Sequence, residues 1–171
     1  MTIMIREYQD TDYQVCRSLY GELAQHHSVI YEDADIAGED PGRGFDEYIK
    51  LPYRQGIWLA VSEKEVVGFA GLLDAPGEEG VVNIEPVVIT VRTRNKGIGT
   101  KLIEHAVNEA RKRGFHFVSI YPVLRNEKAF DLYVRLGFNK IGAIELVQDL
   151  SLNPTRKWKS GIRIHSKELM Y

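Results

Sequence analysis

The sequence has little cysteine, no excess of charge of one sign and no long apolar run. Its 171 residues include one cysteine, Cys16, which excludes an intramolecular disulfide framework and a metal site built from several thiolates. Twenty-two Lys and Arg stand against 24 Asp and Glu, so no overall field draws the chain to nucleic acid. No stretch approaches the roughly 20 apolar residues that span a bilayer, and no signal-peptide run opens the chain. We therefore expect a cytoplasmic protein that binds neither nucleic acid nor membrane.

What is present fits an ordinary globular domain. Hydrophobic residues make up 44% of the chain and charged residues 27%. A chain of this length buries roughly two-thirds of the surface of its unfolded form, which is enough for a core without disulfides or metals. No linker, internal repeat or low-complexity tract divides the sequence, so we expect residues 1–171 to form a single domain.

The spacing of apolar residues predicts an α/β fold with a mixed sheet. Gly97 separates a long β-branched run from the clearest helical pattern, and this order of strand, glycine loop, helix and strand is a βαβ crossover. The acidic, glycine-containing segment 26–44 is expected to be an exposed loop. Strands are expected over 1–8, 57–61, 66–73, 81–91, 115–123 and 141–147, with 160–165 as a further candidate. One helix is expected directly after the capping residues 10–12, and others are expected over 45–51, 98–110 and 126–136.

The segment Arg94-Asn95-Lys96-Gly97-Ile98-Gly99-Thr100 lies between the long strand and that helix. Backbone N–H groups converge at a helix N-terminus, and glycines allow a ligand to approach them closely. Arg92 adds positive charge beside Arg94 and Lys96. The segment therefore favours an anion, and a polyphosphate more than a single carboxylate.

Two other phosphate motifs fit poorly. A Walker A loop needs Gly-Lys-Ser/Thr, whereas Gly99-Thr100-Lys101 has the order wrong. A dinucleotide fingerprint needs a third glycine where Leu102 stands and an acidic residue at the end of the next strand, which is absent. A dinucleotide-binding domain is therefore a distant alternative.

Two motifs in order resemble the GNAT superfamily of N-acetyltransferases. The run 94–99 matches Gln/Arg-x-x-Gly-x-Gly/Ala, and 126–138 resembles Asn-x-x-Ala-x-x-Leu/Phe-Tyr-x-x-x-Gly-Phe. The resemblance covers about residues 3–147, and its strongest part is 57–147. It implies a mixed central sheet with a splayed parallel strand pair, flanked by helices.

The resemblance also implies the acyl donor, acetyl-CoA, and the backbone that binds it. It places the pyrophosphate on the amides of Arg94, Asn95, Lys96, Gly97, Ile98, Gly99 and Thr100. The pantetheine arm would pair with backbone groups of Ile89 and Val91, and Asn126 would reach it from the other side. One amide near Ile89 would polarise the thioester carbonyl.

Acetyl transfer to an amine needs a base and an acid. Glu85 is the candidate base: it interrupts an apolar strand, is expected on the face of Ile89, and burial would raise its pKa. Asn83 would order a relay water. The resemblance assigns Tyr133 as the acid beside the departing sulfur. Two structural alternatives stay open, a Glu85 that pairs with arginine or caps a bulge made by Pro86, and a Tyr133 that only packs in the core.

The remaining features leave the acceptor open. His26 and His27 are adjacent and lack a third ligand, so no metal site is expected. The acidic segment 31–35 suits a cationic amine, carried by a small molecule or a peptide. A homodimer through the C-terminal segment is a further expectation. The alternatives to an acetyltransferase are a CoA-binding sensor without turnover and a transferase of longer acyl chains.

Overall fold

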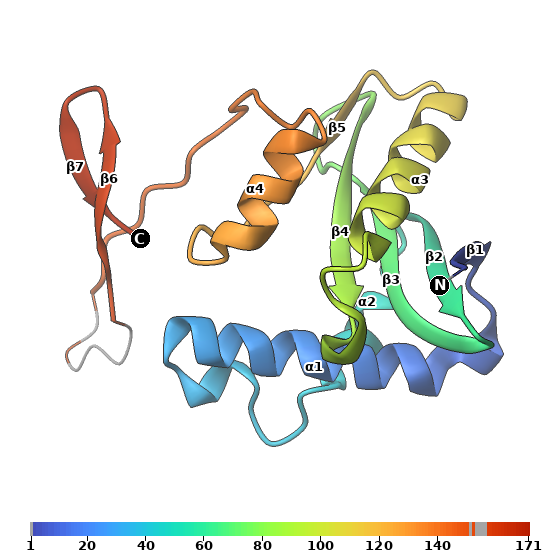
Figure 1. The fold of residues 1–171 in the computed structure, drawn as a ribbon. Coiled ribbons are helices and arrows are strands. Elements are labelled where there is room, and N and C mark those ends of the chain that lie inside the picture. Colours follow the sequence, from blue (N-terminus) through green and yellow to red (C-terminus); the bar gives the residue numbers. More distant parts are fainter. Residues whose placement is uncertain (1, 151, 153–156) are drawn as a thin grey trace.

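The computed structural model describes residues 2–150, 152 and 157–171, so Met1 of the first expected strand lies outside the described residues. Five strands form one sheet in the order β1-β2-β3-β4-β5 (Figure 1). All neighbours are antiparallel except β4 and β5, which confirms the expected mixed sheet and its crossover. The strands are β1 Met4–Glu7, β2 Arg54–Ser62, β3 Glu65–Asp74, β4 Val81–Ile89 and β5 Phe117–Ser119.

Helices cover both faces of the sheet (Figure 1). α1 (Tyr13–Tyr31) and α2 (Arg43–Tyr48) pack on one face, and α3 (Ile98–Lys112) and α4 (Glu127–Arg135) pack on the other. In the described part of the chain no helix is both long and apolar enough to cross a membrane. Three 3-10 turns complete the helical elements: η1 Asp10–Asp12, η2 Ala34–Ile36 and η3 Val91–Thr93.

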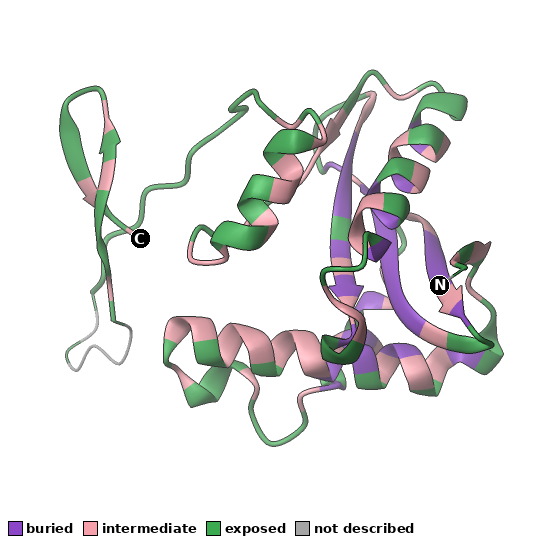
Figure 2. Ribbon diagram, in the orientation of Figure 1, coloured by how far each residue is buried: buried purple, intermediate pink, exposed green. Residues whose placement is uncertain are grey.

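The core consists of two apolar clusters separated by the sheet (Figure 2). Trp58 and Leu102 belong to the cluster on the α3 side, and Phe45 and Phe69 belong to the cluster on the α1 and α2 side. Each is at most 2% exposed. Cys16 packs in the second cluster, where burial raises the pKa of its thiol to about 12. The thiol is therefore protonated at neutral pH and packs in the core.

α1 is longer than the sequence pattern suggests. The expected loop 26–44 begins too early, because the helix continues to Tyr31 and ends where Glu32 takes a left-handed φ of 55°. The N–H of Glu32 donates to the carbonyls of Ser28 and Val29, which closes the helix. His26 and His27 consequently project from a helix rather than from a loop.

The strands expected over 57–61 and 66–73 pair as a hairpin, β2 and β3. Ser62 pairs with Glu65, and the two residues between them, Glu63 and Lys64, have φ values of 50° and 71°. Positive φ at both central positions is the turn geometry that suits the twist of two-residue hairpins.

The strand expected over 115–123 is much shorter than predicted. β5 covers three residues and pairs only with Val81, Val82 and Asn83, whereas the prediction was a buried strand over 115–123. Phe117 is 70% exposed, and the chain leaves the sheet before Pro122. β4 continues beyond this point, so the parallel pair separates.

The C-terminal third contains a wrong prediction and a confirmed one. The run 141–147 forms no strand; it is exposed and lacks regular structure, because no sheet edge pairs with it. The candidate strand near 160 exists as β6 (Ser160–Ile164), which pairs with β7 (Lys167–Met170) in a separate hairpin. This hairpin stands apart from the main sheet (Figure 1).

Candidate active site

The backbone N–H and C=O groups of Ile89 point away from β3, toward the side where β4 and β5 have separated. The N–H of Thr90 donates to the carbonyl of Val67 on β3, at 2.9 Å. Alternate residues of a strand direct their N–H and C=O groups to opposite sides, so those of Ile89 point to the side that β5 has left. An extended ligand with amide groups could pair there, as the sequence predicts.

The N-terminus of α3 lies next to this opening. Gly97 is its N-cap, with φ of 75°, no side chain caps the helix, and no acidic residue occupies its first turn. A Cβ placed on Gly97 would meet nothing within 4 Å. Asn95 also has a positive φ of 63°, and both Asn95 and Lys96 are exposed. Uncapped N–H groups, open space and positive charge are together suited to phosphate.

Side chains of this chain occupy two of the backbone groups that the sequence assigns to the pantetheine arm. The Nε of Arg94 donates to the carbonyl of Ile89 at 3.1 Å. Glu22 on α1 accepts from the backbone N–H of Val91 at 2.9 Å and from the hydroxyl of Thr90 at 3.0 Å. A ligand that used these groups would have to displace Arg94 and Glu22. Neither contact was foreseen, because Glu22 is simply a polar residue of an amphipathic helix in the sequence.

α1 also brings histidine to the loop. The pKa of His26, one turn after Glu22, is lowered first by burial and then by the nearby charges of Arg94 and His27. Burial also lowers the pKa of His27. Both side chains are therefore neutral at pH 7. The described residues contain no group of three or more His, Cys, Asp or Glu side chains that could hold a metal.

Glu85 lies at an irregularity in β4. Ala70 pairs with Val87 and Leu72 with Ile84, so Gly71 alone faces the two residues Glu85 and Pro86. This bulge shifts the alternation of β4, because an extra residue reverses the faces that follow it.

The bulge makes two expectations about Glu85 wrong. Ile84 and Ile89 both pack against the α3 side, so Glu85 does not share the face of Ile89. The Glu85 side chain is also exposed rather than buried, and forms no salt bridge among the described residues. It is therefore accessible to an acceptor from the α1 and α2 side.

Two tyrosines flank Glu85 on that side. The negative charge of Glu85 contributes, after burial, to a raised pKa of Tyr20 on α1. The pKa of Tyr48 on α2 is raised mainly by burial, with Glu85 as a further cause. The Tyr48 hydroxyl is buried and has no hydrogen-bond partner in the described structure. Sequence reasoning did not single out either tyrosine, since both appear there as ordinary apolar-face residues.

The other expected site residues have structural partners. Asn83 is buried and accepts a hydrogen bond from the hydroxyl of Ser119, so it links β4 to β5 and does not share a site with Glu85. The Asn126 side chain accepts from the N–H of Ala129 at 3.2 Å and caps α4. Tyr133 is partly buried on α4 against the α3-side cluster, and burial raises its pKa. A raised pKa keeps its hydroxyl protonated, as an acid requires.

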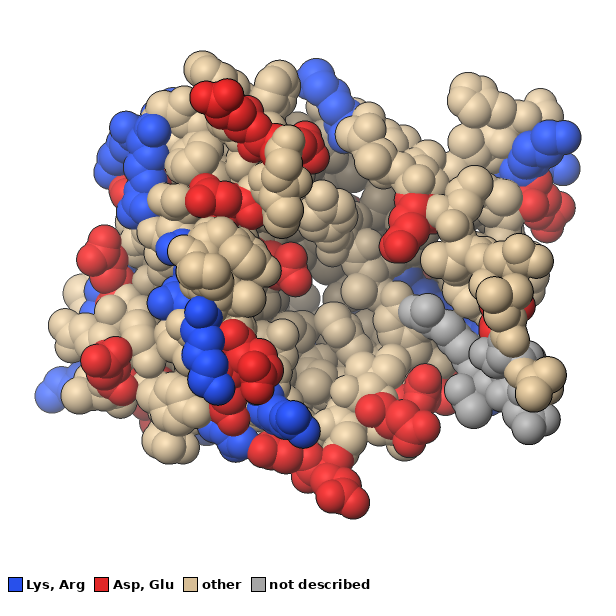
Figure 3. Space-filling view, turned by 180° about the vertical axis from the view of Figure 1, so that it is seen from behind, with Lys and Arg blue, Asp and Glu red and all other residues tan. Residues whose placement is uncertain are grey.

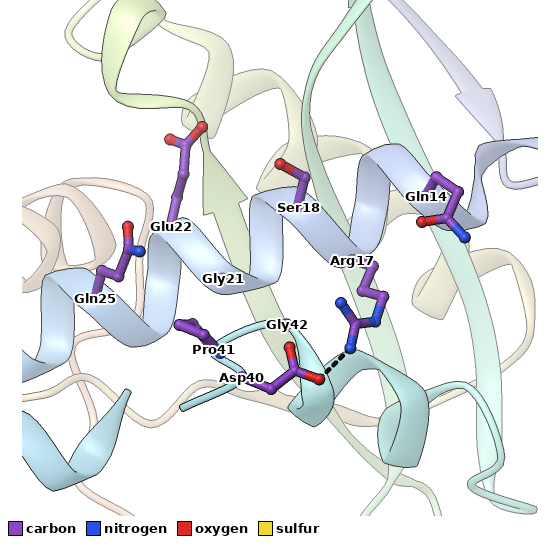
Figure 4. Close-up of a pocket in the computed structure, with 9 residues that line it drawn as sticks. All are labelled: Gln14, Arg17, Ser18, Gly21, Glu22, Gln25, Asp40, Pro41 and Gly42. Atoms are coloured by element: carbon purple, nitrogen blue, oxygen red, sulfur yellow. Dashed lines mark hydrogen bonds and ion pairs between the residues drawn. The ribbon is translucent and has the colours of Figure 1, made fainter. Parts of the chain in front are cut away.

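A surface hollow of about 370 Å³ lies between α1 and the segment 40–42, where Arg17 pairs with Asp40 (Figure 4). Arg17 also pairs with Asp46. The lining of this hollow includes none of the site residues expected from the sequence. Seen from behind, the surface is also hollowed near its centre, mostly between uncharged side chains, with acidic side chains on either side (Figure 3).

Comparison with known proteins decides the family. The profile of the Acetyltransferase (GNAT) family matches residues 9–138. The chain belongs to this family. The match includes both the loop before α3 and all of α4, so the GNAT assignment covers the two motifs that the sequence offered.

Individual relatives of this GNAT chain are distant. It is 25% identical to an L-methionine sulfoximine/L-methionine sulfone acetyltransferase of Pseudomonas aeruginosa, over 91% of this chain and 98% of the relative. It is 29% identical to a probable N-acetyltransferase camello of Xenopus tropicalis, over 55% of this chain and 42% of the relative. The chain spans less than half the length of the first curated relatives that it matches, namely 42%, 26% and 40%.

Solved structures share the fold of this GNAT chain. An aminoglycoside N-acetyltransferase, AAC(6')-Iy in complex with CoA, superposes with a TM-score of 0.65 at 16% identity, over 88% of this chain and 96% of that one. A ribosomal-protein-alanine N-acetyltransferase from Brucella melitensis gives 0.68 at 16% identity, over 88% and 100%. The likeness confirms the single mixed sheet flanked by helices.

Proposed function

We propose that the chain is an N-acetyltransferase that transfers the acetyl group of acetyl-CoA directly to a primary amine of a small molecule or a peptide. The observation that carries the proposal is the uncapped N-terminus of α3 beside the open edge of β4. Family membership and a fold shared with a CoA-bound aminoglycoside N-acetyltransferase support the same donor.

The residues fit the phosphates of CoA. The first-turn amides of α3, with the amides of 94–97 before them, offer donors to a pyrophosphate, and Gly97 leaves the space open. Backbone groups of Ile89 and Val91 would hold the pantetheine arm once Arg94 and Glu22 turn away. Asn126 would approach from the α4 side while keeping its cap. Bound acetyl-CoA would supply the activated thioester.

Glu85 is proposed as the base. An alkylammonium has no lone pair, so the acceptor must lose a proton before its nitrogen attacks the thioester carbon. The exposed carboxylate on the α1 and α2 side can accept that proton directly or through a water. A backbone N–H at the open edge of β4 near Ile89 would polarise the carbonyl oxygen. When the carbon–sulfur bond breaks, Tyr133 would give its proton to the leaving thiolate and regain one from solvent.

The acceptor is proposed to be cationic and small or extended enough to reach Glu85. The exposed carboxylate of Glu85 would itself attract an ammonium group. One relative, which aligns with 91% of this chain, is named L-methionine sulfoximine/L-methionine sulfone acetyltransferase. Its name supports a small amino compound as the acceptor.

A homodimer is part of the proposal. Apolar side chains of the segment 141–150 are strongly exposed, Ile141 at 80%, Leu146 at 74% and Leu150 at 83%, and such exposure is typical of association surfaces. Light scattering coupled to gel filtration measures the mass in solution. A monomer at all concentrations would contradict the dimer without touching the reaction.

The first experiment is calorimetric titration with acetyl-CoA, CoA and NAD, followed by thiol release from acetyl-CoA in the presence of amines. Expected are binding of both CoA compounds, no binding of NAD, and amine-dependent release. Binding without release for any amine class would favour a sensor, and preference for longer acyl thioesters would favour the other alternative. Absence of CoA binding would overturn the proposal.

Glu85→Gln tests the base within the same assay. The change removes the proton acceptor but keeps the shape, so turnover should fall by roughly 100-fold or more near neutral pH while acetyl-CoA affinity stays the same. Glu78→Gln, an exposed glutamate in the turn before β4, is the matched control. Unchanged turnover of Glu85→Gln would remove Glu85 from the mechanism.

A further inference from the structure

Tyr48 ends α2 with a hydroxyl that the fold does not use. The residue is 5% exposed, and its hydroxyl has no hydrogen-bond partner among the described residues. Among the described residues, the only other buried side-chain polar atom without a hydrogen-bond partner is Nε2 of His105. His105 lies on the other side of the sheet, against Trp58. Buried hydroxyls are normally paired, so an unpaired one needs a reason.

The hydroxyl lies at the β4 bulge. A Cβ built on Gly71 would come within 1.7 Å of the Tyr48 oxygen and within 2.8 Å of the Glu85 carbonyl oxygen. The space that a side chain at residue 71 would take is thus filled by the Tyr48 hydroxyl, directly beside the backbone of Glu85. Any residue other than glycine at position 71 would push the hydroxyl away.

The groups that face this hydroxyl come from three elements. Arg54 on β2 donates to the carbonyls of Tyr48 and Ile49, so its guanidinium is held at the end of α2. Cys16 on α1 is a protonated thiol. The charge of Glu85 on β4 contributes to the raised pKa of both Tyr48 and Tyr20, and the Glu85 backbone lies beside the Tyr48 hydroxyl at the bulge. An unused donor therefore lies next to the strand position that carries an exposed carboxylate.

We propose that Tyr48 is a positioning residue for the base: when the acceptor binds, the Tyr48 hydroxyl, which is unpaired in this structure, donates a hydrogen bond to the Glu85 carboxylate and orients it toward the amine. The inference rests on the proposed role of Glu85. The proton of the amine passes to Glu85, while Tyr48 keeps its own proton throughout. Burial raises the pKa of Tyr48, so the hydroxyl is a donor and not a second base.

The test is the pH profile of Tyr48→Phe. A hydrogen bond to a carboxylate favours its charged form, so its loss should raise the pKa of the base in the substrate complex and move the acidic limb of kcat to higher pH. We expect kcat to fall by roughly tenfold near neutral pH, with the KM for acetyl-CoA unchanged. Tyr13→Phe is the matched control: this ring contacts Phe45 as Tyr48 does, but its hydroxyl donates to Asp46. It should leave the limb in place.

Two further variants distinguish a failure of the Tyr48 inference from a failure of the proposed role of Glu85. In a Glu85→Gln background, Tyr48→Phe should have no additional effect on the residual rate. Gly71→Ala should reproduce the shift of the limb, because it displaces the same hydroxyl from the other side. A wild-type profile for folded Tyr48→Phe overturns this inference and leaves the base in place. Full activity of Glu85→Gln overturns the proposed function itself.

Discussion

A side chain at Gly97 would have two separate effects, one on the backbone conformation and one on the space beside the loop. Its φ of 75° lies in the left-handed region, and the space at its Cβ position is open. Gly77, in the turn before β4, shares both properties with φ of 80° but lies away from α3. The pair therefore separates backbone strain from ligand exclusion.

We predict that Gly97→Leu and Gly77→Leu each lose about 1–2 kcal/mol of stability through the left-handed backbone. Only Gly97→Leu should weaken CoA binding, by roughly tenfold or more, because its side chain enters the phosphate approach. Calorimetry with CoA and thermal melts measure both effects. Equal CoA affinity in the two variants would place the phosphates elsewhere.

Sequence pattern predicted the loop at Gly97 and the helix that follows it, because a glycine loop before a helix is a local signal. For Glu85 it offered a buried base and, as an alternative, a bulge made by Pro86, and the bulge is what forms. Burial and face were inferred from unbroken alternation, but the bulge opposite Gly71 adds a residue and turns Glu85 to the α1 side. Bulges depend on which residues of the neighbouring strand pair, and that pairing is not a local property.

At the level of elements, α1 acts on the end of β4 through Glu22. The carboxylate holds the N–H of Val91 and the hydroxyl of Thr90, close to the loop proposed to bind phosphates. Glu22 thus links α1 to the end of β4 by hydrogen bonds, and it places a negative charge near the proposed anion site.

We predict that Glu22→Gln binds CoA more tightly, by about threefold to tenfold at low salt, because repulsion is removed while an acceptor oxygen remains. The gain should shrink as salt screens the charge. Calorimetry at two salt concentrations measures it, and Glu39→Gln, an exposed residue of the loop after η2, serves as the control. Weaker binding by Glu22→Gln would mean that the Glu22 hydrogen bonds hold the loop in its binding shape.

Arg125 connects three elements at the other end of α1. Its guanidinium donates to the carbonyl of Tyr31 at 3.4 Å, to that of Tyr171 at 2.9 Å and to that of Lys157, and it lies 4.9 Å from the Tyr31 ring centroid. A salt bridge of 2.8 Å between Lys157 and Glu32 adds to the connection. The hairpin of β6 and β7 is fastened to the domain at this point.

We predict that Arg125→Gln speeds amide exchange in β6 and β7 by roughly tenfold, as expected for the loss of charge-assisted hydrogen bonds. Exchange in β2, β3 and β4 should not change. Arg163→Gln, on the exposed face of β6, is the matched control. Unchanged protection of the hairpin in Arg125→Gln would show that other contacts hold it.

The strand predicted over 141–147 failed for a reason at this scale. The run is rich in apolar residues, but a strand needs a partner edge, and β5 leaves the sheet after three residues. The hairpin that does form was half predicted, since only its first strand carries a clear β pattern.

For the whole molecule, histidines set the response to mild acid. Burial lowers the pKa of His26, His27 and His105 in the folded state below the ordinary value of about 6.5. The unfolded chain then binds more protons than the folded one as pH falls through this range. The histidines contribute their full stabilisation at pH values above the pKa of the unfolded state. This stabilisation is lost as the pH falls toward the lower pKa values of the folded state.

We predict that the free energy of unfolding decreases between about pH 7.5 and about pH 5.5. Urea denaturation at both values measures the change. The lowered pKa of Asp12, which pairs with Arg6, adds a loss only below about pH 4 and does not interfere. His105→Gln should reduce the dependence, and stability that stays constant or rises on acidification would contradict the prediction.

The pairing of β1 with β2 has a consequence for the order of events during synthesis. Met4 pairs with Val61 and Glu7 with Trp58, and all of α1 and α2 lies between the paired strands. Closing so long a loop costs chain entropy before any contact repays it. As the chain leaves the ribosome, β1 and the apolar face of α1 emerge without the hairpin on which they dock. They stay exposed until β2 and β3 have been made, so this is the period in which the nascent chain most needs protection from aggregation.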